Sequence, residues 1–63
     1  MNYYGMFAYK GSIYQGTGPC RIKKRELQDK SWVHGILYEK DGIVYCRELL
    51  DFLEKFKEVK VEA

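Results

Sequence analysis

The sequence has few of the residues that build catalytic or metal centres. Its 63 residues include one histidine, two cysteines and one proline. A structural zinc site needs four ligands, usually in paired spacings, whereas this chain offers Cys20, His34 and Cys46 with no such pair. The predicted elements do not place two carboxylates together as an acid–base couple would require. We therefore expect no enzyme activity, no metal site and no cofactor.

Long apolar runs and an excess of charge of one sign are also lacking. No segment approaches the roughly 18 apolar residues of a membrane span, and the first residues, MNYYGMFAYK, lack the pattern of a signal peptide. The expectation is a cytoplasmic protein with reduced thiols and no membrane partner. With 11 cations against 9 anions, the net charge of +2 is too balanced to indicate nucleic-acid binding by itself.

Aromatic side chains, in contrast, are abundant. They make up 16% of the chain, and hydrophobic residues make up 46%. Because one aromatic side chain buries on the order of 150–250 Å², a single domain covering residues 1–63 can form a core. A core of this size is marginal, so a second copy of the chain is an alternative means of completing it.

Most of the chain has the pattern of short strands, followed by one helix. Strands are expected at 3–9, 13–14, 20–27, 32–39 and 43–46, and a helix at about 48–59. Asp41-Gly42 predicts a tight hairpin between the last two strands. Gly16-Thr17-Gly18-Pro19 is interpreted as a turn, because it lacks the Lys-Ser/Thr ending of a phosphate-binding loop and does not open a helix.

The predicted helix has one apolar face. Its members recur at the i, i+3, i+4, i+7 spacing and are Leu49, Phe52, Leu53, Phe56 and Val59, with Leu50 on the shoulder. Asp51 and Lys55 form a favourable i, i+4 ion pair. A helix this short needs a surface to pack on. The sheet is the expected surface, and a second copy or a membrane are the less favoured alternatives.

The segment after the glycines predicts a strand with one cationic face. Alternation puts Cys20, Ile22 and Lys24 on one side and Arg21, Lys23 and Arg25 on the other. We interpret Cys20 and Cys46 as buried core thiols, with a regulatory disulfide as the alternative if they prove adjacent. We interpret His34 as a partly buried packing residue.

Two short motifs carry a resemblance to a known group of domains. The segment 9–14, YKGSIY, resembles the Y-K-G-x-x-Y opening of a family of short bacterial and phage domains, and the segment 47–52, RELLDF, resembles their closing R-x-L-x-x-F. The order of elements looks like an SH3-like small β-barrel. This resemblance implies a mostly β fold, a partly open five-stranded barrel capped by the C-terminal amphipathic helix, with a phage or mobile-element origin and a non-enzymatic role.

These features predict a small protein-binding module, which the resemblance suggests is a phage-encoded modulator or inhibitor of a host protein. The residues expected to contact the partner are aromatic or cationic, namely Tyr3, Tyr4, Tyr14, Arg21, Lys23 and Arg25. The alternative is a nucleic-acid-binding barrel in which the cationic row acts with Trp32 or Tyr38, because bases stack on aromatic rings while cations follow the backbone. A merely solvated strand face is the third interpretation of the cationic row, and a cysteine-dependent enzyme or redox sensor is the least favoured function.

Overall fold

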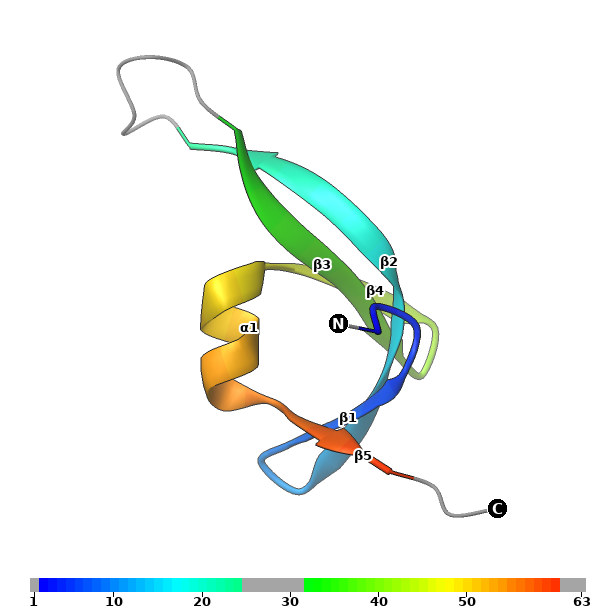
Figure 1. The fold of residues 1–63 in the computed structure, drawn as a ribbon. Coiled ribbons are helices and arrows are strands. Elements are labelled where there is room, and N and C mark those ends of the chain that lie inside the picture. The colour runs from blue at the N-terminus through cyan, green and yellow to red at the C-terminus, as the bar shows by residue number, and fades with distance from the viewer. Residues whose placement is uncertain (1, 25–31, 61–63) are drawn as a thin grey trace.

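The computed structural model describes residues 2–24 and 32–60 and contains one antiparallel sheet and one helix (Figure 1). The elements along the chain are β1 (Met6–Tyr9), β2 (Ser12–Lys23), β3 (Trp32–Lys40), β4 (Ile43–Glu48), α1 (Leu49–Lys55) and β5 (Lys57–Val59). The strand order in the sheet is β4-β3-β2-β1-β5. The expected mostly β class with a single helix is therefore confirmed.

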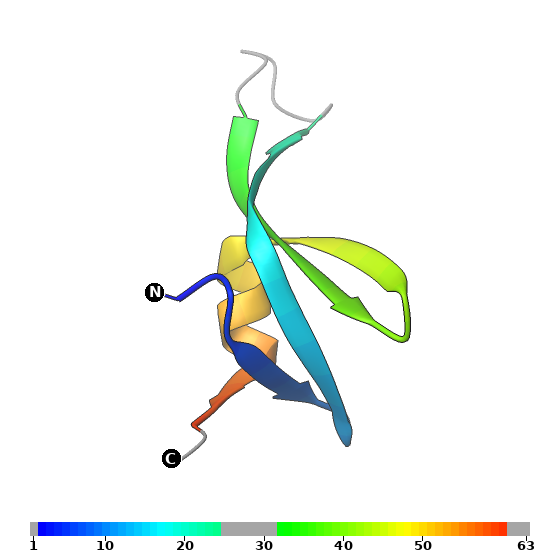
Figure 2. The same ribbon diagram turned by 90° about the vertical axis from the view of Figure 1, so that its right-hand side faces the viewer.

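The sheet is curved but does not close into a barrel. Its edge strands are β4 and β5, which lie at opposite ends of the strand order. The chain connects these two edges through α1, which lies across the open side of the curved sheet (Figures 1 and 2). The helix thus covers the concave face, as expected of a cap.

One end of the sheet is a two-stranded arm. Strand β1 pairs with β2 only as far as Gln15, and β4 pairs with β3 only as far as Gly35. The remaining ladder continues between β2 and β3 up to the pair Lys23 and Trp32. The two strands therefore extend past the rest of the sheet, which is consistent with overall dimensions of 45 × 23 × 19 Å (Figure 2).

The predicted glycine turn is wrong, because 13–14 and the start of 20–27 belong to one continuous strand. Gly16 pairs with Tyr38 and Gly18 pairs with Leu37, so Thr17 is the extra residue of a β-bulge. Gly18 has a φ of 143°, a backbone conformation that side chains oppose. The glycines therefore bend the strand instead of reversing it. The predicted end of this strand at Leu27 lies outside the described residues.

The predicted end of the helix is also wrong. Phe56 has extended backbone angles, φ −98° and ψ 146°, and Val59 pairs with Met6 in the sheet. The fifth strand thus follows the helix, and the expected first strand begins at Met6 instead of Tyr3. Helical spacing could not show this, because Phe56 is buried in the core although it is the residue at which the helix ends. The residues after it pair with β1 as β5 instead of continuing the helix.

The hairpin between β3 and β4 is confirmed. Lys40 pairs with Ile43, leaving two loop residues. Both have positive φ, 52° at Asp41 and 79° at Gly42, as a type I′ turn requires.

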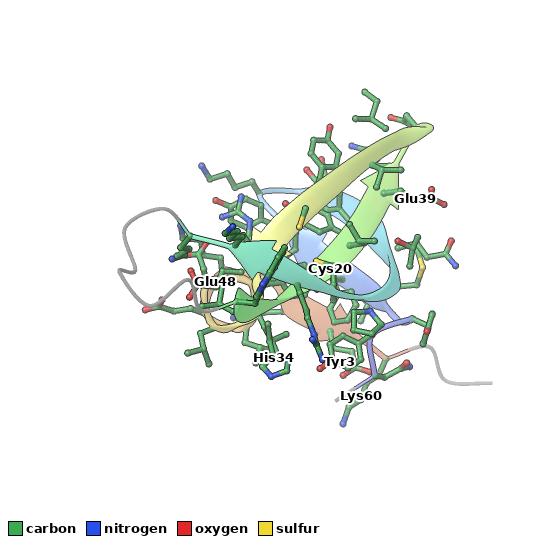
Figure 3. All side chains as sticks on the ribbon, turned by 90° about the horizontal axis from the view of Figure 1, so that it is seen from above. Tyr3, Cys20, His34, Glu39, Glu48 and Lys60 are labelled. Atoms are coloured by element: carbon green, nitrogen blue, oxygen red, sulfur yellow. The ribbon has the colours of Figure 1, made fainter. Side chains whose placement is uncertain are left out.

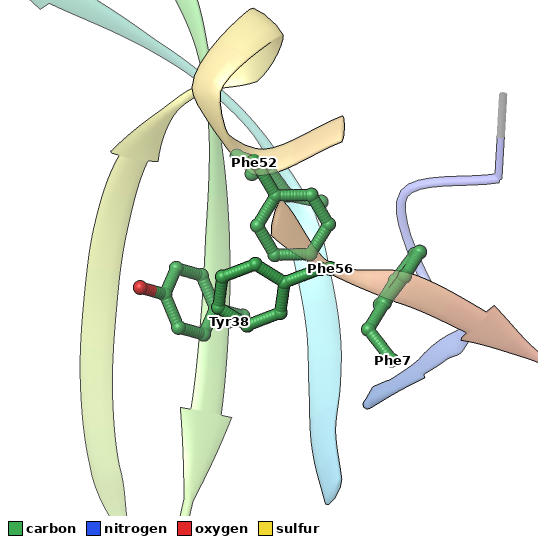
Figure 4. Close-up of a cluster of buried hydrophobic side chains, with 5 residues drawn as sticks. Phe7, Tyr38, Phe52 and Phe56 are labelled. Carbon is green, nitrogen blue, oxygen red and sulfur yellow. The ribbon is translucent and has the colours of Figure 1, made fainter. Parts of the chain in front are cut away.

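The core is almost entirely aromatic (Figure 4). The buried cluster consists of Phe7, Ile36, Tyr38, Phe52 and Phe56. Phe52 and Phe56 stack with ring centroids 4.1 Å apart, and Phe7 meets Phe52 edge-on at 4.9 Å. The rings of Phe52 and Phe56 thus pack together with those of Phe7 and Tyr38, and this packing holds the helix on the sheet.

Gly16 lies where β2 contacts the N-terminal segment, and we predict that it tolerates no side chain. Its N–H donates a 2.8 Å hydrogen bond to Gly5, and a Cβ at this position would lie 2.0 Å from the Tyr3 carbonyl oxygen. Because backbone must move, Gly16→Ala should lower the free energy of unfolding by roughly 2–3 kcal/mol in urea denaturation. Gly5→Ala is the control, since its Cβ would meet Asn2 at an ordinary 3.4 Å. Equal losses in the two variants would contradict this account.

Candidate functional site

The cationic row lies on the two-stranded arm and is interleaved with ring side chains. The register places Arg21 opposite His34 and Lys23 opposite Trp32. Directly opposite residues share one face of the sheet, so the four side chains form a compact block. Arg21, Lys23, Trp32 and His34 are all exposed, and we refer to them as the arm face. Arg25, the third predicted cation, lies outside the described residues.

An apolar hollow of about 370 Å³ adjoins the arm face. It is lined by Trp32, Val33, His34, Glu48, Leu49 and Leu50. The indole of Trp32 is 58% exposed and the side chain of Leu50 is 74% exposed. Two large apolar side chains thus remain in water at one place, where the first turn of α1 meets the base of the arm.

A second hollow joins the arm face to the N-terminal segment. Tyr3, Pro19, Cys20, Arg21 and His34 line it. Tyr3 and His34 point to the same side of the sheet (Figure 3). The structure therefore brings the predicted contact residues Tyr3 and Arg21 together, and His34 is exposed instead of partly buried as predicted.

The other predicted tyrosines lie elsewhere. Tyr4 is 63% exposed, and its ring lies beside Gly18. Tyr14 packs against the core, with ring centroids 5.5 Å from both Tyr38 and Phe56. Of the rings proposed for base stacking, Tyr38 is only 4% exposed, which leaves Trp32 as the accessible one of that pair.

Arg47 positions the helix that carries Leu49 and Leu50. Its Nε donates to the Tyr38 hydroxyl at 3.2 Å, and its Nη1 pairs with Asp51 at 2.7 Å. The guanidinium also lies 5.5 Å from the centre of the Phe56 ring, at cation–π distance. One side chain of β4 therefore contacts the sheet, the core and α1, and it fixes where the helix begins beside the arm.

The same contacts shift two ionisation equilibria. The hydrogen bonds with Tyr38 and Asp51 raise the pKa of Arg47 above its usual range, so this guanidinium stays charged. The hydrogen bonds from Arg47 and then from Lys55 lower the pKa of Asp51. The predicted pair of Asp51 and Lys55 is confirmed, with a separation of 3.0 Å.

The two cysteines are not the buried core thiols that we predicted. Cys46 is exposed and Cys20 is half-buried, yet their sulfur atoms lie 3.1 Å apart. They occupy the sheet face opposite the aromatic core, because Cys20 pairs with Gly35, and Cys46 with Leu37, on either side of core residue Ile36. Burial, followed by the hydrogen bond with Cys46, raises the pKa of Cys20 to about 11.

The free edge of β4 is another exposed apolar surface. Ile43, Val44 and Tyr45 are all exposed along it. An edge strand has backbone N–H and C=O groups available for pairing with another strand. The free edge of β4 therefore combines exposed apolar side chains with backbone groups that have no partner strand on that side.

Other candidate chemistry is sparse in the part of the chain that the structure describes. Across residues 2–24 and 32–60, no three side chains among His, Cys, Asp and Glu gather as metal ligands would. Within the same residues, no helix combines the length and apolar character needed to cross a membrane.

Sequence reasoning missed the part of the site that α1 contributes. The helical spacing puts Leu50 on the shoulder of the apolar stripe and predicts no role for Glu48 and Leu49 outside the helix. A leucine displaced from the buried stripe is a weak signal of a second contact surface. Nothing in the sequence indicates that the start of the helix adjoins the arm, because that contact depends on the curvature of the sheet.

Comparisons with known proteins returned no relative. No family model matches the chain, and neither a curated protein nor a solved structure does.

The lowered pKa of Asp51 predicts a pH-dependent contribution to stability. A carboxyl group whose pKa is lower in the folded state stabilises the fold above its unfolded pKa of about 3.9, and this stabilisation is lost as the pH falls through the folded value. Asp51→Asn should therefore lower the thermal midpoint at pH 7, and the difference from wild type should shrink below about pH 4. Glu54→Gln removes a carboxylate from an exposed position of the same helix and serves as the control. A pH-independent difference for Asp51→Asn would refute the assignment.

Proposed function

We propose that the chain is a non-enzymatic protein-binding module that binds an acidic segment carrying an apolar anchor residue. The observation that supports it is the position of the apolar hollow beside two cations. Trp32 belongs to both surfaces, since it lines the hollow and pairs across the strands with Lys23. An apolar side chain seated in the hollow would remove Trp32 and Leu50 from water, at about 25 cal/mol for each Å² of apolar surface buried.

The residue types favour a protein partner over a small molecule. Tryptophan and arginine are enriched among the residues that dominate the energy of protein interfaces. Arg21 and Lys23 stand at the rim, where charges mainly increase the rate of association and select partners of opposite sign. A module of this kind fits a phage-encoded modulator or inhibitor of a host protein, in which the phage origin and the non-enzymatic role are what the resemblance implies.

We also propose that the fold is an SH3-like, partly open barrel. A curved five-stranded antiparallel sheet, with a helix across its open side, supports an SH3-like, partly open barrel. In this arrangement the arm face and the hollow lie at the end of the sheet where only β2 and β3 remain paired, so a partner can reach them without displacing a strand.

Affinity capture from a nuclease-treated bacterial lysate, with the tagged chain as bait, tests the proposal. Trp32→Ala and the double variant Arg21→Glu, Lys23→Glu should each reduce capture of the partner at least about tenfold, because they remove the anchor wall and reverse the rim charge. The charge-matched control is Lys57→Glu, Lys60→Glu, which alters two exposed cations, one in β5 and one directly after it. Capture that survives both arm variants, or that the control abolishes equally, would overturn the proposed surface.

A second candidate function is binding of single-stranded nucleic acid, favoured by the direct pairing of Lys23 with Trp32. Trp32 is the one tryptophan of the chain, so its fluorescence reports on this face alone. If bases stack on the indole, an oligothymidylate should quench this fluorescence. The affinity should fall with rising salt, by a slope of about −0.7 for each phosphate contacted. Unchanged fluorescence at low salt would exclude this function.

A further inference from the structure

We propose that Cys20 and Cys46 form a dithiol site that reacts reversibly with low-molecular-weight disulfides of the glutathione type and thereby links β2 to β4. This inference goes beyond the proposed function and does not rest on it. It starts from the position of the two sulfur atoms, which no interpretation of the arm face uses.

The fold brings together two thiols that are distant in sequence. Cys20 and Cys46 are 26 positions apart, on strands that are separated by β3. Their sulfur atoms nevertheless lie 3.1 Å apart. Formation of a disulfide at about 2.05 Å therefore requires the sulfur atoms to approach by about 1 Å, and because β2 and β4 lie two strand spacings apart, it also requires these strands to be drawn together.

Gly35 of β3 makes this contact possible. It pairs with Cys20, and a Cβ at its position would lie 2.8 Å from the Cys20 sulfur and 3.0 Å from the Arg47 carbonyl oxygen. Any other residue would occupy the space through which the Cys20 side chain reaches across β3. Because Gly35 has no side chain, the Cys20 side chain of β2 can extend over β3 toward β4.

The two thiols differ in a way that sets the order of reaction. Cys46 is exposed, so a soluble disulfide can reach it, whereas Cys20 is half-buried behind it. The pKa of Cys20 is raised to about 11, so this thiol stays protonated at neutral pH. Cys46 is therefore the attacking residue, and Cys20 resolves the intermediate that forms beside it.

The reaction balances as two thiol–disulfide exchanges. The Cys46 thiolate attacks one sulfur of oxidised glutathione, the S–S bond breaks, and one glutathione leaves as a thiolate that takes up the proton lost by Cys46. Cys20 then loses its proton and attacks the Cys46 sulfur, and the second glutathione leaves and is protonated. The protein gains one disulfide, and one glutathione disulfide becomes two glutathione thiols. Excess reduced glutathione reverses both steps.

The test uses the full chain, reduced and then equilibrated with oxidised and reduced glutathione in varied ratio. After an acid quench and alkylation, the intact mass should decrease by the two thiol hydrogens, and peptide mapping should recover a Cys20–Cys46 link. The thermal midpoint of the oxidised form should rise by on the order of 10 °C, because the link closes a long loop, and dithiothreitol should reverse the rise.

Single serine variants distinguish a paired site from two independent thiols. Cys20→Ser should retain one glutathione on Cys46, since no second thiol can release it. Cys46→Ser should react more slowly, because Cys20 is half-buried. Reduced wild type provides the control for folding. The far-UV circular dichroism of both variants should match that of reduced wild type. A wild type that retains bound glutathione as Cys20→Ser does, or that forms dimers linked through Cys46, would overturn the proposal.

Discussion

The stack of Phe52 on Phe56 is the contact on which the rest of the structure depends. A seven-residue helix is too short to persist alone in water, so α1 exists because its rings are buried. Phe52 meets Phe7 of β1 and Tyr38 of β3, while Phe56 stacks on Tyr9. The chain can then leave the helix at Phe56 and pair as β5 with β1. Loss of this stack would release the helix, the last strand and the cover of the concave face together.

The curvature that lets one short helix cover the sheet also explains the unusual positions of the glycines. A flat β2 without the bulge would stay away from the N-terminal segment. Instead, Gly16 touches the Tyr3 backbone at the bulge, and Gly35 admits the Cys20 side chain toward Cys46. At both positions a neighbouring group thus comes so close to the strand that only a residue without a Cβ fits. The same bending leaves the arm of β2 and β3 free beyond the covered core.

Much of the local structure was predictable, because local chemistry determines it. The Asp-Gly hairpin, the aromatic core and the Asp51–Lys55 pair all follow from residue type and spacing. The prediction of a glycine turn was wrong because bulges and turns favour the same residue types, and only pairing with the partner strand distinguishes them. The predicted end of the helix was wrong because Phe56 has the spacing of the apolar helical stripe, yet it is the residue at which the chain leaves the helix. The thiol pair depends on strand register and on the space above Gly35, and the hollow depends on sheet curvature, and no spacing in the sequence records either.

Arg47 connects the stable part of the molecule to its exposed surface. Through Tyr38 and Asp51 it joins the buried core to the first turn of α1, and that turn places Leu49 and Leu50 beside Trp32. Exposed apolar side chains gathered at one place are typical of interaction sites, and the binding that we propose would give Trp32 and Leu50 a role beside Arg21 and Lys23. The core needs Leu49 and the phenylalanines, whereas Leu50 and Trp32 contribute little to it. Leu49 contributes to the core and also lines the hollow, whereas Leu50 contributes only to the exposed surface, so the residue that folding uses least is the one that the proposed partner would bury.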